Sequence, residues 1–501
     1  MLAATFSATL VGITAELVRV EADVSFGLPS FTLVGLPDTS VRESRDRVRS
    51  AIRNAGLEFP PHRITVNLSP ADLRKEGTSF DLPIALAVLA AGGQTPPAAA
   101  GQTLVLGELS LDGAIVPGRG ILPAALAARA HAVPRLLVPA GNVAEARVVP
   151  GVTVLAADTL TNALRALACP DAPGGDEPTP LAPPDADGAD LSEVRGQLGA
   201  RRALEIAAAG NHHLLLCGPP GAGKTMLARR LPGLLPPWTF DEALEATAIH
   251  SAAGLVRPGS ALLGGRPFRA PHHTVSTAAL VGGGPQPRPG EVSLAHHGVL
   301  FLDEAPEFDR RTLDVLRQPL EERRVHLARV ARSVTFPADF LFVAAMNLCP
   351  CGLRGHPTRT CTCRPGDVDR YAGRLSGPVR DRIDLAVDVP PVEFAALSAA
   401  AGESSQEVRA RVAAARGLQM ARQRTANARL SGEAVRTLDR EPGVRALLAR
   451  AVDRFGLSAR AVDRVLRVAR TIADLEAAPQ VSRLHVAEAL QFRVQRKEGL
   501  C

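Results

Sequence analysis

The residues best suited to chemistry in this sequence form a glycine-rich loop that follows an apolar run. The apolar run covers residues 212–217, and the loop comprises Gly218, Pro219, Pro220, Gly221, Ala222, Gly223, Lys224 and Thr225. Glycines at this spacing let successive backbone N–H groups point at phosphate oxygens, and a helix N-terminus adds the positive end of its dipole. Lys224 can then reach the β- and γ-phosphates, and Thr225 can bind Mg²⁺. The order of strand, loop and helix predicts a nucleotide-binding loop.

A second motif pairs with this loop. Residues 299–302 are apolar and are followed by Asp303 and Glu304. A buried strand with a solvated acidic end would give the same pattern. Downstream of a phosphate-binding loop, however, the pattern favours Asp303 in the Mg²⁺ shell and Glu304 as the group that polarises the attacking water. The two motifs together predict ATP hydrolysis.

Composition sets the limits of the fold. A chain of 501 residues is long enough for two or three domains, and 46% apolar with 22% charged residues is typical of globular proteins. No apolar run approaches the roughly 20 residues of a membrane helix, and residues 1–30 lack the pattern of a signal peptide. We therefore expect a cytoplasmic protein with no membrane partner.

Charge is concentrated toward the C-terminus. Residues 401–501 contain 19 Lys+Arg and 11 Asp+Glu, a net charge of +8, against +6 for the whole chain. An anionic partner such as nucleic acid and a solvated arginine-rich surface both account for this excess.

Elements of an α/β domain lie in residues 1–169. Strands are predicted at 15–24, 30–34 and 63–67, and helices at 41–55 and 81–91.

The segments KEGTSFD (75–81) and LGELSLDG (106–113) resemble the proteolytic domain of Lon, in which a serine is activated by a lysine. Ser79 occupies the place of that serine, but residues 116–125 contain no lysine. A serine without a base is a poor nucleophile, so we expect a Lon-like fold without peptidase activity.

An acidic, proline-rich linker is predicted at residues 170–190. It contains six prolines, six acidic residues and no basic residue, a composition that cannot form a packed core. The linker separates the first domain from a P-loop ATPase core at 191–395, with a parallel sheet, and a C-terminal helical lid at 396–501.

Four segments, 190–229, 266–273, 289–296 and 345–352, resemble the magnesium-chelatase-like AAA+ ATPases, and specifically the ComM/YifB family. The resemblance spans nearly the whole chain, including the Lon-like domain. It implies that Asn347 is the sensor that helps place the hydrolytic water. It also implies that Arg382 is the finger that reaches a neighbouring subunit's γ-phosphate, and that Arg460 in the lid is the second sensor. A guanidinium suits both arginine roles because it stays charged and offers two donors to phosphate.

A basic hairpin is predicted at residues 321–334. In related hexameric motors, loops at this place project into the central pore. Arg329 and Arg332 near its turn would suit a phosphate backbone, so they are the expected DNA contacts.

Cysteines form the last motif. Cys349, Cys351, Cys361 and Cys363 make two C-x-C pairs, and four thiolates can supply a tetrahedral structural Zn²⁺ site. Four reduced structural cysteines remain the alternative.

The resemblance implies an ATP- and Mg²⁺-dependent homohexameric motor that acts on DNA, a helicase for branch migration during natural transformation and homologous recombination. Single-stranded, duplex or branched DNA and recombination proteins are the implied partners. Two other functions stay open. One is a chelatase-type motor that remodels a protein partner. The other is a Lon-like ATP-dependent protease, against which the missing lysine counts.

Overall fold

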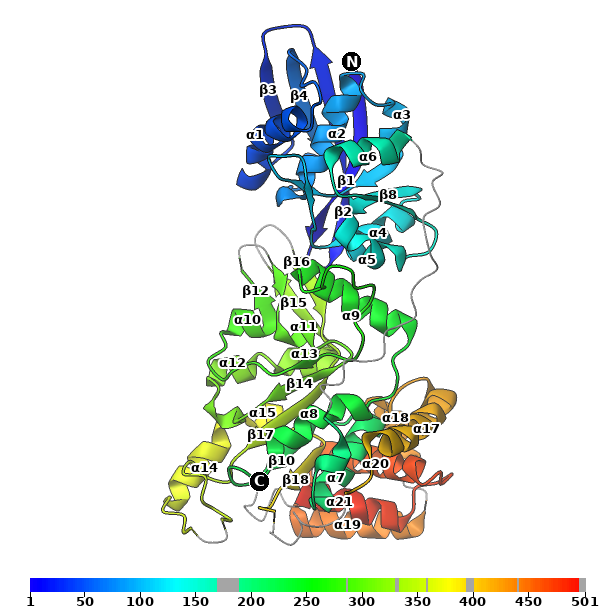
Figure 1. Ribbon diagram of the computed structural model, residues 1–501. Coiled ribbons are helices and arrows are strands. Elements are labelled where there is room, and N and C mark those ends of the chain that lie inside the picture. Colours follow the sequence, from blue (N-terminus) through cyan, green and yellow to red (C-terminus); the bar gives the residue numbers. More distant parts are fainter. Residues whose placement is uncertain are drawn as a thin grey trace.

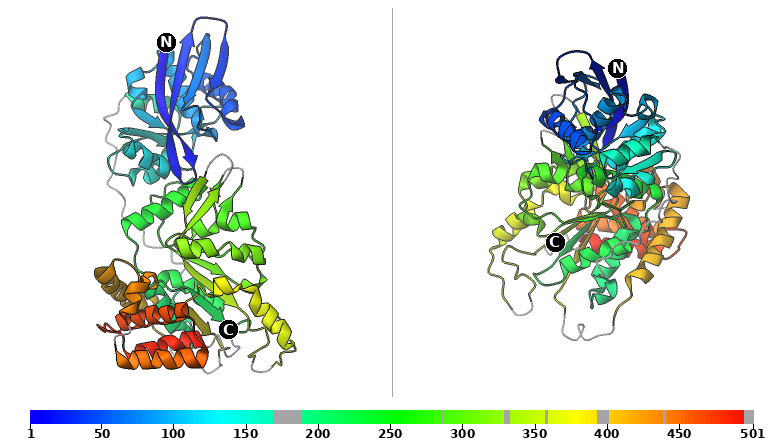
Figure 2. Two further views of the ribbon diagram at one scale, coloured as in Figure 1. Left: turned by 180° about the vertical axis from the view of Figure 1, so that it is seen from behind. Right: turned by 45° about the horizontal axis from the view of Figure 1, so that its top comes forward.

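The computed structural model describes residues 1–168, 189–284, 287–328, 333–356, 359–392, 401–438 and 441–494. These residues form an N-terminal α/β domain, a core built on a parallel sheet, and a helical lid (Figure 1). The N-terminal domain and the lid lie at opposite ends of the core (Figures 1 and 2). Among the described helices, none combines the length and the apolar character that crossing a membrane requires.

A seven-stranded mixed sheet organises the N-terminal domain, in the order β3-β4-β2-β1-β5-β8-β9. Its strands are β1 (Leu2–Val11), β2 (Thr14–Ser25), β3 (Ser30–Val34), β4 (Arg63–Ser69), β5 (Thr103–Val105), β8 (Arg135–Pro139) and β9 (Thr153–Ala157), and β6 (Glu108–Leu109) pairs separately with β7 (Ile115–Val116). Its helices are α1 (Thr39–Asn54), α2 (Asp81–Ala91), α3 (Pro97–Ala100), α4 (Ile121–Ala130), α5 (Val143–Arg147) and α6 (Leu160–Ala168). All eleven residues of α2 are buried, as its alanine- and leucine-rich sequence requires. The strands and helices predicted for this domain are confirmed.

The N-terminal domain packs directly on the core. Helix α4 lies against α9 (Phe240–Ala253) of the core, and the Gly120 N–H donates to the Ser251 carbonyl at 3.0 Å. The tight turn between β1 and β2 touches the core as well, because a Cβ placed on Gly12 would meet Val334 Cγ1 at 2.5 Å. Of the predicted linker, only residues 189–190 are described; the rest lies outside the described residues.

Five parallel strands form the core sheet, in the order β11-β14-β17-β10-β18. They are β11 (Phe268–Arg269), β14 (Val299–Leu302), β17 (Leu341–Met346), β10 (Leu214–Cys217) and β18 (Leu385–Asp388). The core helices are α7 (Leu198–Gly210), α8 (Lys224–Leu234), α9, α10 (Thr277–Val281), α11 (Glu291–Leu294), α12 (Arg310–Asp314), α13 (Arg317–Glu322), α14 (Pro365–Arg374) and α15 (Gly377–Arg380). Strands β10, β14 and β17 are buried on both faces, which explains their continuous apolar sequences.

Two short antiparallel pairs are inserted in the core. One joins β12 (Gly282–Gly283) to β13 (Arg288–Pro289). The other is the predicted hairpin, in which β15 (Arg324–Ala328) pairs with β16 (Ser333–Pro337) from Arg324↔Pro337 to Ala328↔Ser333. The hairpin lies at the end of the core that faces the N-terminal domain (Figure 1).

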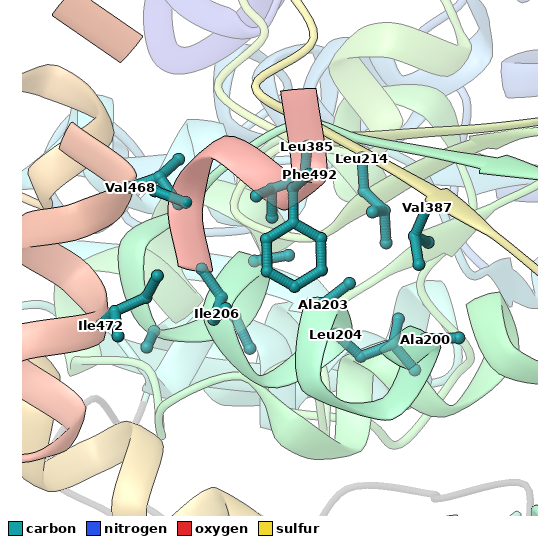
Figure 3. Close-up of a cluster of buried hydrophobic side chains, with 14 of the residues drawn as sticks. Ala200, Ala203, Leu204, Ile206, Leu214, Leu385, Val387, Val468, Ile472 and Phe492 are labelled. Atoms are coloured by element: carbon teal, nitrogen blue, oxygen red, sulfur yellow. The ribbon is translucent and has the colours of Figure 1, made fainter. Parts of the chain in front are cut away.

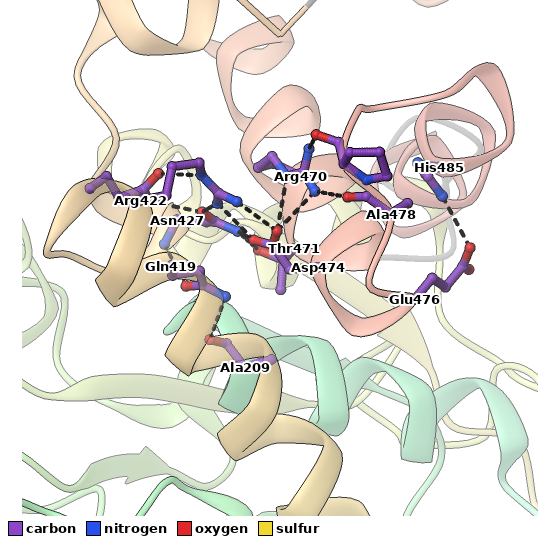
Figure 4. A network of polar contacts seen from close by, with 12 residues as sticks. Ala209, Gln419, Arg422, Asn427, Arg470, Thr471, Asp474, Glu476, Ala478 and His485 are labelled. Carbon is purple, nitrogen blue, oxygen red and sulfur yellow. Dashed lines mark hydrogen bonds and ion pairs between the residues drawn. The ribbon is translucent and has the colours of Figure 1, made fainter.

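The lid consists of α17 (Ser405–Gln423), α18 (Gly432–Arg436), α19 (Pro442–Phe455), α20 (Ala459–Leu475) and α21 (Arg483–Val494). Val468 and Ile472 of α20 and Phe492 of α21 pack against α7 and the sheet (Figure 3). A buried polar network holds the lid together, since the Asp474 carboxylate accepts from Arg422, Asn427 and Arg470 at 2.7–2.8 Å (Figure 4). The lid is therefore fixed to the core by apolar packing and internally by charge-assisted hydrogen bonds.

Candidate nucleotide site and its surroundings

The glycine-rich loop joins β10 to α8 in the conformation that phosphate binding requires. Gly221 and Gly223 have φ of +78° and +91°, which favour glycine, and a Cβ at either position would meet no atom within 4 Å. Gly218 is needed for a different reason, because a Cβ there would lie 2.1 Å from the Val389 carbonyl oxygen. The loop thus leaves an open face at the N-terminus of an eleven-residue helix.

Lys224 lies within this loop. Its Nζ donates to the carbonyl oxygens of Gly218 (2.8 Å) and Pro219 (2.9 Å). It also donates to Asn347 Oδ1 at 3.0 Å, which places the predicted sensor at the phosphate end of the loop. Burial lowers the pKa of Lys224, while Asp303 and Glu304 act in the opposite direction. The ammonium group is thus held by neutral oxygens that a phosphate can replace.

Asp303 and Glu304 directly follow β14 and differ in environment. Thr225 Oγ1 donates to Asp303 Oδ2 at 2.5 Å, so the two groups expected to hold Mg²⁺ already lie in contact. Glu304 is exposed and has φ of +50°, a left-handed conformation that is rare for a residue with a side chain. Backbone strain of this kind is common at active sites, where the surrounding structure holds a side chain in one direction.

The parallel sheet explains why these groups meet. Lys224, Asp303 and Asn347 all follow the carboxyl ends of strands β10, β14 and β17, and these ends share one edge of the sheet. The chemistry of these groups fits ATP and Mg²⁺. The loop with Lys224 can bind the phosphates, and Thr225 and Asp303 can bind the metal. Glu304 and Asn347 can position the attacking water.

Arg382 lies at the opposite edge. It precedes β18, and β18 runs parallel to β10 with Leu214↔Leu385 and Cys217↔Asp388. Four residues of strand therefore separate Arg382 from the phosphate-binding loop, a distance of about 13 Å along the sheet. Arg382 Nη1 donates to the Pro378 carbonyl oxygen at 2.6 Å, and the guanidinium pairs with Glu321 of α13. Arg382 is thus positioned away from its own chain's nucleotide site.

A cavity of about 360 Å³ surrounds Arg382. Five arginines line it, against three acids; the residues are Arg323, Arg382, Arg429, Arg464, Arg467, Glu321, Asp339 and Asp384. Three arginine side chains thus come from the lid and two from the core. Because guanidinium groups outnumber carboxylates in its lining, the cavity is suited to binding an anion.

Arg460 is exposed at the N-terminus of α20. Arg460 lies one turn before Arg464 but does not line the Arg382 cavity, so its role as second sensor stays a prediction. The sequence reasoning missed Arg464 and Arg467, although the spacing 460, 464, 467 is a helical stripe of arginines.

The four cysteines converge as their spacing predicts. Sγ atoms lie 3.4 Å apart for Cys349 and Cys351, 3.6 Å for Cys351 and Cys361, and 3.6 Å for Cys361 and Cys349. All four Sγ atoms, including that of Cys363, are within 4.8 Å of one another. The cluster is compatible with one Zn²⁺.

A second cluster consists of Glu245, His296 and His297. Both rings contact the Glu245 carboxylate through Nε2, at 3.2 and 2.8 Å, and these hydrogen bonds lower the pKa of Glu245 to about 2. The Asp339 N–H donates to His296 Nδ1 at 3.0 Å. Because Nδ1 is an acceptor, the neutral His296 ring has its proton on Nε2, which therefore donates to Glu245. This cluster is explained by hydrogen bonds and is assigned no metal.

Ser79 lines a cavity of about 360 Å³ in the N-terminal domain, with Glu76, Glu108 and Arg119 nearby. No lysine is among the described residues that line it. Lys75 is buried and donates instead to the Pro70 carbonyl oxygen. The arrangement provides no amine to activate Ser79.

Arg329 and Arg332 lie outside the described residues, in the sequence between β15 and β16. Their role as DNA contacts therefore stays a prediction.

The geometry of the core defines the class of protein to which this chain belongs. A phosphate-binding loop, an acidic pair and a polar sensor at the carboxyl edge of a 5-1-4-3-2 type sheet, followed by a helical lid, are the parts of an AAA+ ATPase.

Comparisons with known families identify the branch. Residues 190–397 match "Magnesium chelatase, subunit ChlI", residues 20–142 match "Subunit ChlI of Mg-chelatase", and residues 402–493 match "Magnesium chelatase, subunit ChlI C-terminal". An uncharacterized protein of Mycobacterium tuberculosis is 47% identical over 97% of this chain and 98% of its own length. YifB of Escherichia coli is 46% identical over 96% and 95% of the two chains, and competence protein ComM of Haemophilus influenzae is 44% identical over 98% and 97%.

This chain belongs to the ComM/YifB family of magnesium-chelatase ChlI-like AAA+ ATPases. A shorter match, 32% identity over 148 residues, links it to Lon protease 2 of Bacillus subtilis, covering 27% of this chain and 26% of that protein. The predicted fold class, a Lon-like domain, a parallel AAA+ core and a helical C-terminal region, is confirmed.

Proposed function

We propose that this AAA+ ATPase is a cytoplasmic ring motor, a homohexamer, that uses ATP hydrolysis to move DNA junctions. The particular activity we assign is branch migration during homologous recombination, including the integration of incoming DNA in natural transformation. The coarser part of this statement, an ATPase of the ComM/YifB family, rests on the comparisons above.

One observation supports the ring above all others. Arg382 is at the amino edge of the core sheet and Lys224 is at the carboxyl edge. An arginine finger placed there can act only on the nucleotide of another subunit, and a closed ring gives every site such a neighbour. Arg464 and Arg467 beside it add to the positive charge that a neighbour's phosphates would meet.

Two observations favour DNA as the substrate. The relative from Haemophilus influenzae is named a competence protein. The segment between β15 and β16 has the sequence Arg329-Val330-Ala331-Arg332, whose two arginines could bind phosphates without reading bases.

Branch migration is tested with a fluorescently labelled three- or four-strand junction, ATP and Mg²⁺. The parent protein should release the labelled strand only with ATP, and Lys224→Ala should bind the junction without moving it. Lack of movement by an active parent ATPase, across several junction structures, would refute the DNA assignment. ATP-dependent remodelling of a protein partner would then favour the chelatase-type motor.

A further inference from the structure

The four-cysteine cluster lies in a segment whose described residues are mostly exposed. The described residues from Cys349 to Arg364 contain no helix or strand, and only Cys349 and Gly352 among them are buried. A segment of this kind cannot be fixed by a hydrophobic core of its own, and small units without such a core are usually cross-linked by metal or disulfide. The observed Sγ separations of 3.4–3.6 Å exclude a disulfide, for which the S–S distance is about 2.05 Å.

The separations fit one metal ion. Four sulfurs at about 2.3 Å from a tetrahedral Zn²⁺ are about 3.8 Å from one another, close to the distances that join Cys349, Cys351 and Cys361. Cys363 is within 4.8 Å of the other three and completes the set. An iron–sulfur cluster would hold the cysteine sulfurs farther apart than these contacts allow.

Backbone amides support the same thiolates. The Arg354 N–H donates to Cys349 Sγ at 3.3 Å, and the backbone of Leu353 hydrogen-bonds to Cys351. Hydrogen bonds of this kind orient the ligands and offset part of their negative charge.

The segment from Asn347 to Tyr371, which contains the cluster, contacts the nucleotide site in two places. Gly352 lies against Pro220 of the phosphate-binding loop, since a Cβ on Gly352 would approach Pro220 Cγ to 2.7 Å. At the other end, Tyr371 of α14 is buried and forms a hydrogen bond with the backbone of Asn347, two residues before Cys349. The segment between Asn347 and Tyr371 thus returns to the sensor from which it starts.

We propose that these four cysteines bind one structural Zn²⁺, and that the zinc-bound loop supports the nucleotide site by holding Gly352 against Pro220 and Asn347 beside Lys224. The ion takes no part in hydrolysis. Its contribution is to fix the position of a phosphate-binding backbone and of the sensor amide. The proposal rests on the ATPase site but not on the ring or on DNA.

Metal content is the first test. Elemental analysis of the full-length protein should find about one zinc per chain. Cys361→Ser should lose it, whereas Thr362→Ala, an exposed neighbour, should retain it. Iron in place of zinc, or four freely titratable thiols and no metal in the parent, would overturn the assignment.

The link between the zinc-bound loop and nucleotide binding is tested by a matched pair of glycine variants. Gly352 and Gly355 have φ of +74° and +77°, so alanine strains both backbones alike, but only Gly352 faces Pro220. Gly352→Ala should keep its zinc and weaken binding of a fluorescent ATP analogue by about tenfold or more, a larger effect than in Gly355→Ala. Removing zinc from the parent with a chelator should weaken binding similarly, and adding zinc back should restore it. Equal nucleotide affinities in the two glycine variants, or unchanged affinity after zinc removal, would refute the link between the zinc-bound loop and the nucleotide site. ATP hydrolysis by the parent protein would still support the ATPase assignment.

Discussion

The position of Arg382 gives a quantitative prediction for mixed assemblies. Arg382→Ala leaves the phosphate-binding loop of its own chain intact, so ATP should still bind, but the neighbouring site loses its finger. Removal of an arginine finger lowers kcat by about 10³- to 10⁵-fold. In the resting chain Arg382 pairs with Glu321. The Glu321 side chain is 59% exposed and that of Arg382 15%, so solvent screens the pair only partly.

The assay mixes Arg382→Ala with Lys224→Ala, each inactive by itself. A site works only where a subunit with an intact loop meets a neighbour with an intact finger. In randomly mixed rings with equal amounts of the two variants, about one site in four satisfies both conditions, so about a quarter of the parent ATPase rate should return if sites act independently. A mixture of Lys224→Ala with the double variant is the matched control and should stay inactive.

Two results would refute this reasoning. If Arg382→Ala rings hydrolyse ATP at the parent rate, the finger is another residue. If both variants form rings and exchange subunits but their mixture stays inactive, Arg382 does not act across the interface.

Four further predictions follow from individual residues. Glu304→Gln should bind ATP normally and slow hydrolysis by orders of magnitude, measured in single turnover; normal turnover would remove Glu304 from its assigned role. Alanine at both Arg329 and Arg332 should weaken DNA binding and retain basal ATPase activity. The slope of log binding constant against log salt concentration should fall in magnitude by up to about two units, and unchanged binding isotherms would exclude the hairpin as the DNA contact. ATP-dependent degradation of casein should be absent, and any that is lost in Ser79→Ala would contradict the inactive-peptidase assignment. Burial lowers the pKa of His213 to about 4, and Phe342 N–H donates to its Nδ1, so the unfolded chain binds the extra proton first. The contribution of the neutral His213 ring to stability is therefore fully present above its unfolded pKa of about 6.5 and is lost on acidification. Between pH 7.5 and 5 the parent should lose about 2 kcal/mol more than His213→Asn in urea unfolding, and equal losses would refute the neutral ring.

Local sequence was sufficient for the groups that surround the nucleotide. Asp303 and Asn347 directly follow short apolar strands, and Lys224 follows a third strand through the glycine-rich loop. Parallel strands place their carboxyl ends together, so the motif positions also give the geometry. The hairpin predicted at residues 321–334 is present, but its strands are Arg324–Ala328 and Ser333–Pro337, because residues 321–322 end helix α13.

Tertiary contacts explain what sequence could not supply. The Arg382 cavity is lined from α13 and its C-terminus, from the segment before β18, and from two parts of the lid, which only folding brings together. The contact between Gly352 and Pro220 likewise joins segments that are far apart in the chain. Charge counting was misleading in one respect, because Arg422 and Arg470 in the basic C-terminal segment are bound to buried Asp474. Part of the positive charge there stabilises the lid and is not available to a partner.

The ion pair between Arg382 and Glu321 connects the two functional regions of the proposed motor. Glu321 is in the last turn of α13, three residues before Arg324 begins the hairpin strand β15. Arg323 between them has φ of +56°, and its carbonyl accepts from Ala338 N–H at 2.8 Å, so a hydrogen bond closes the base of the hairpin. In the proposed ring, we expect a neighbour's γ-phosphate that attracts Arg382 to release Glu321, which lies less than one helical turn before the hairpin.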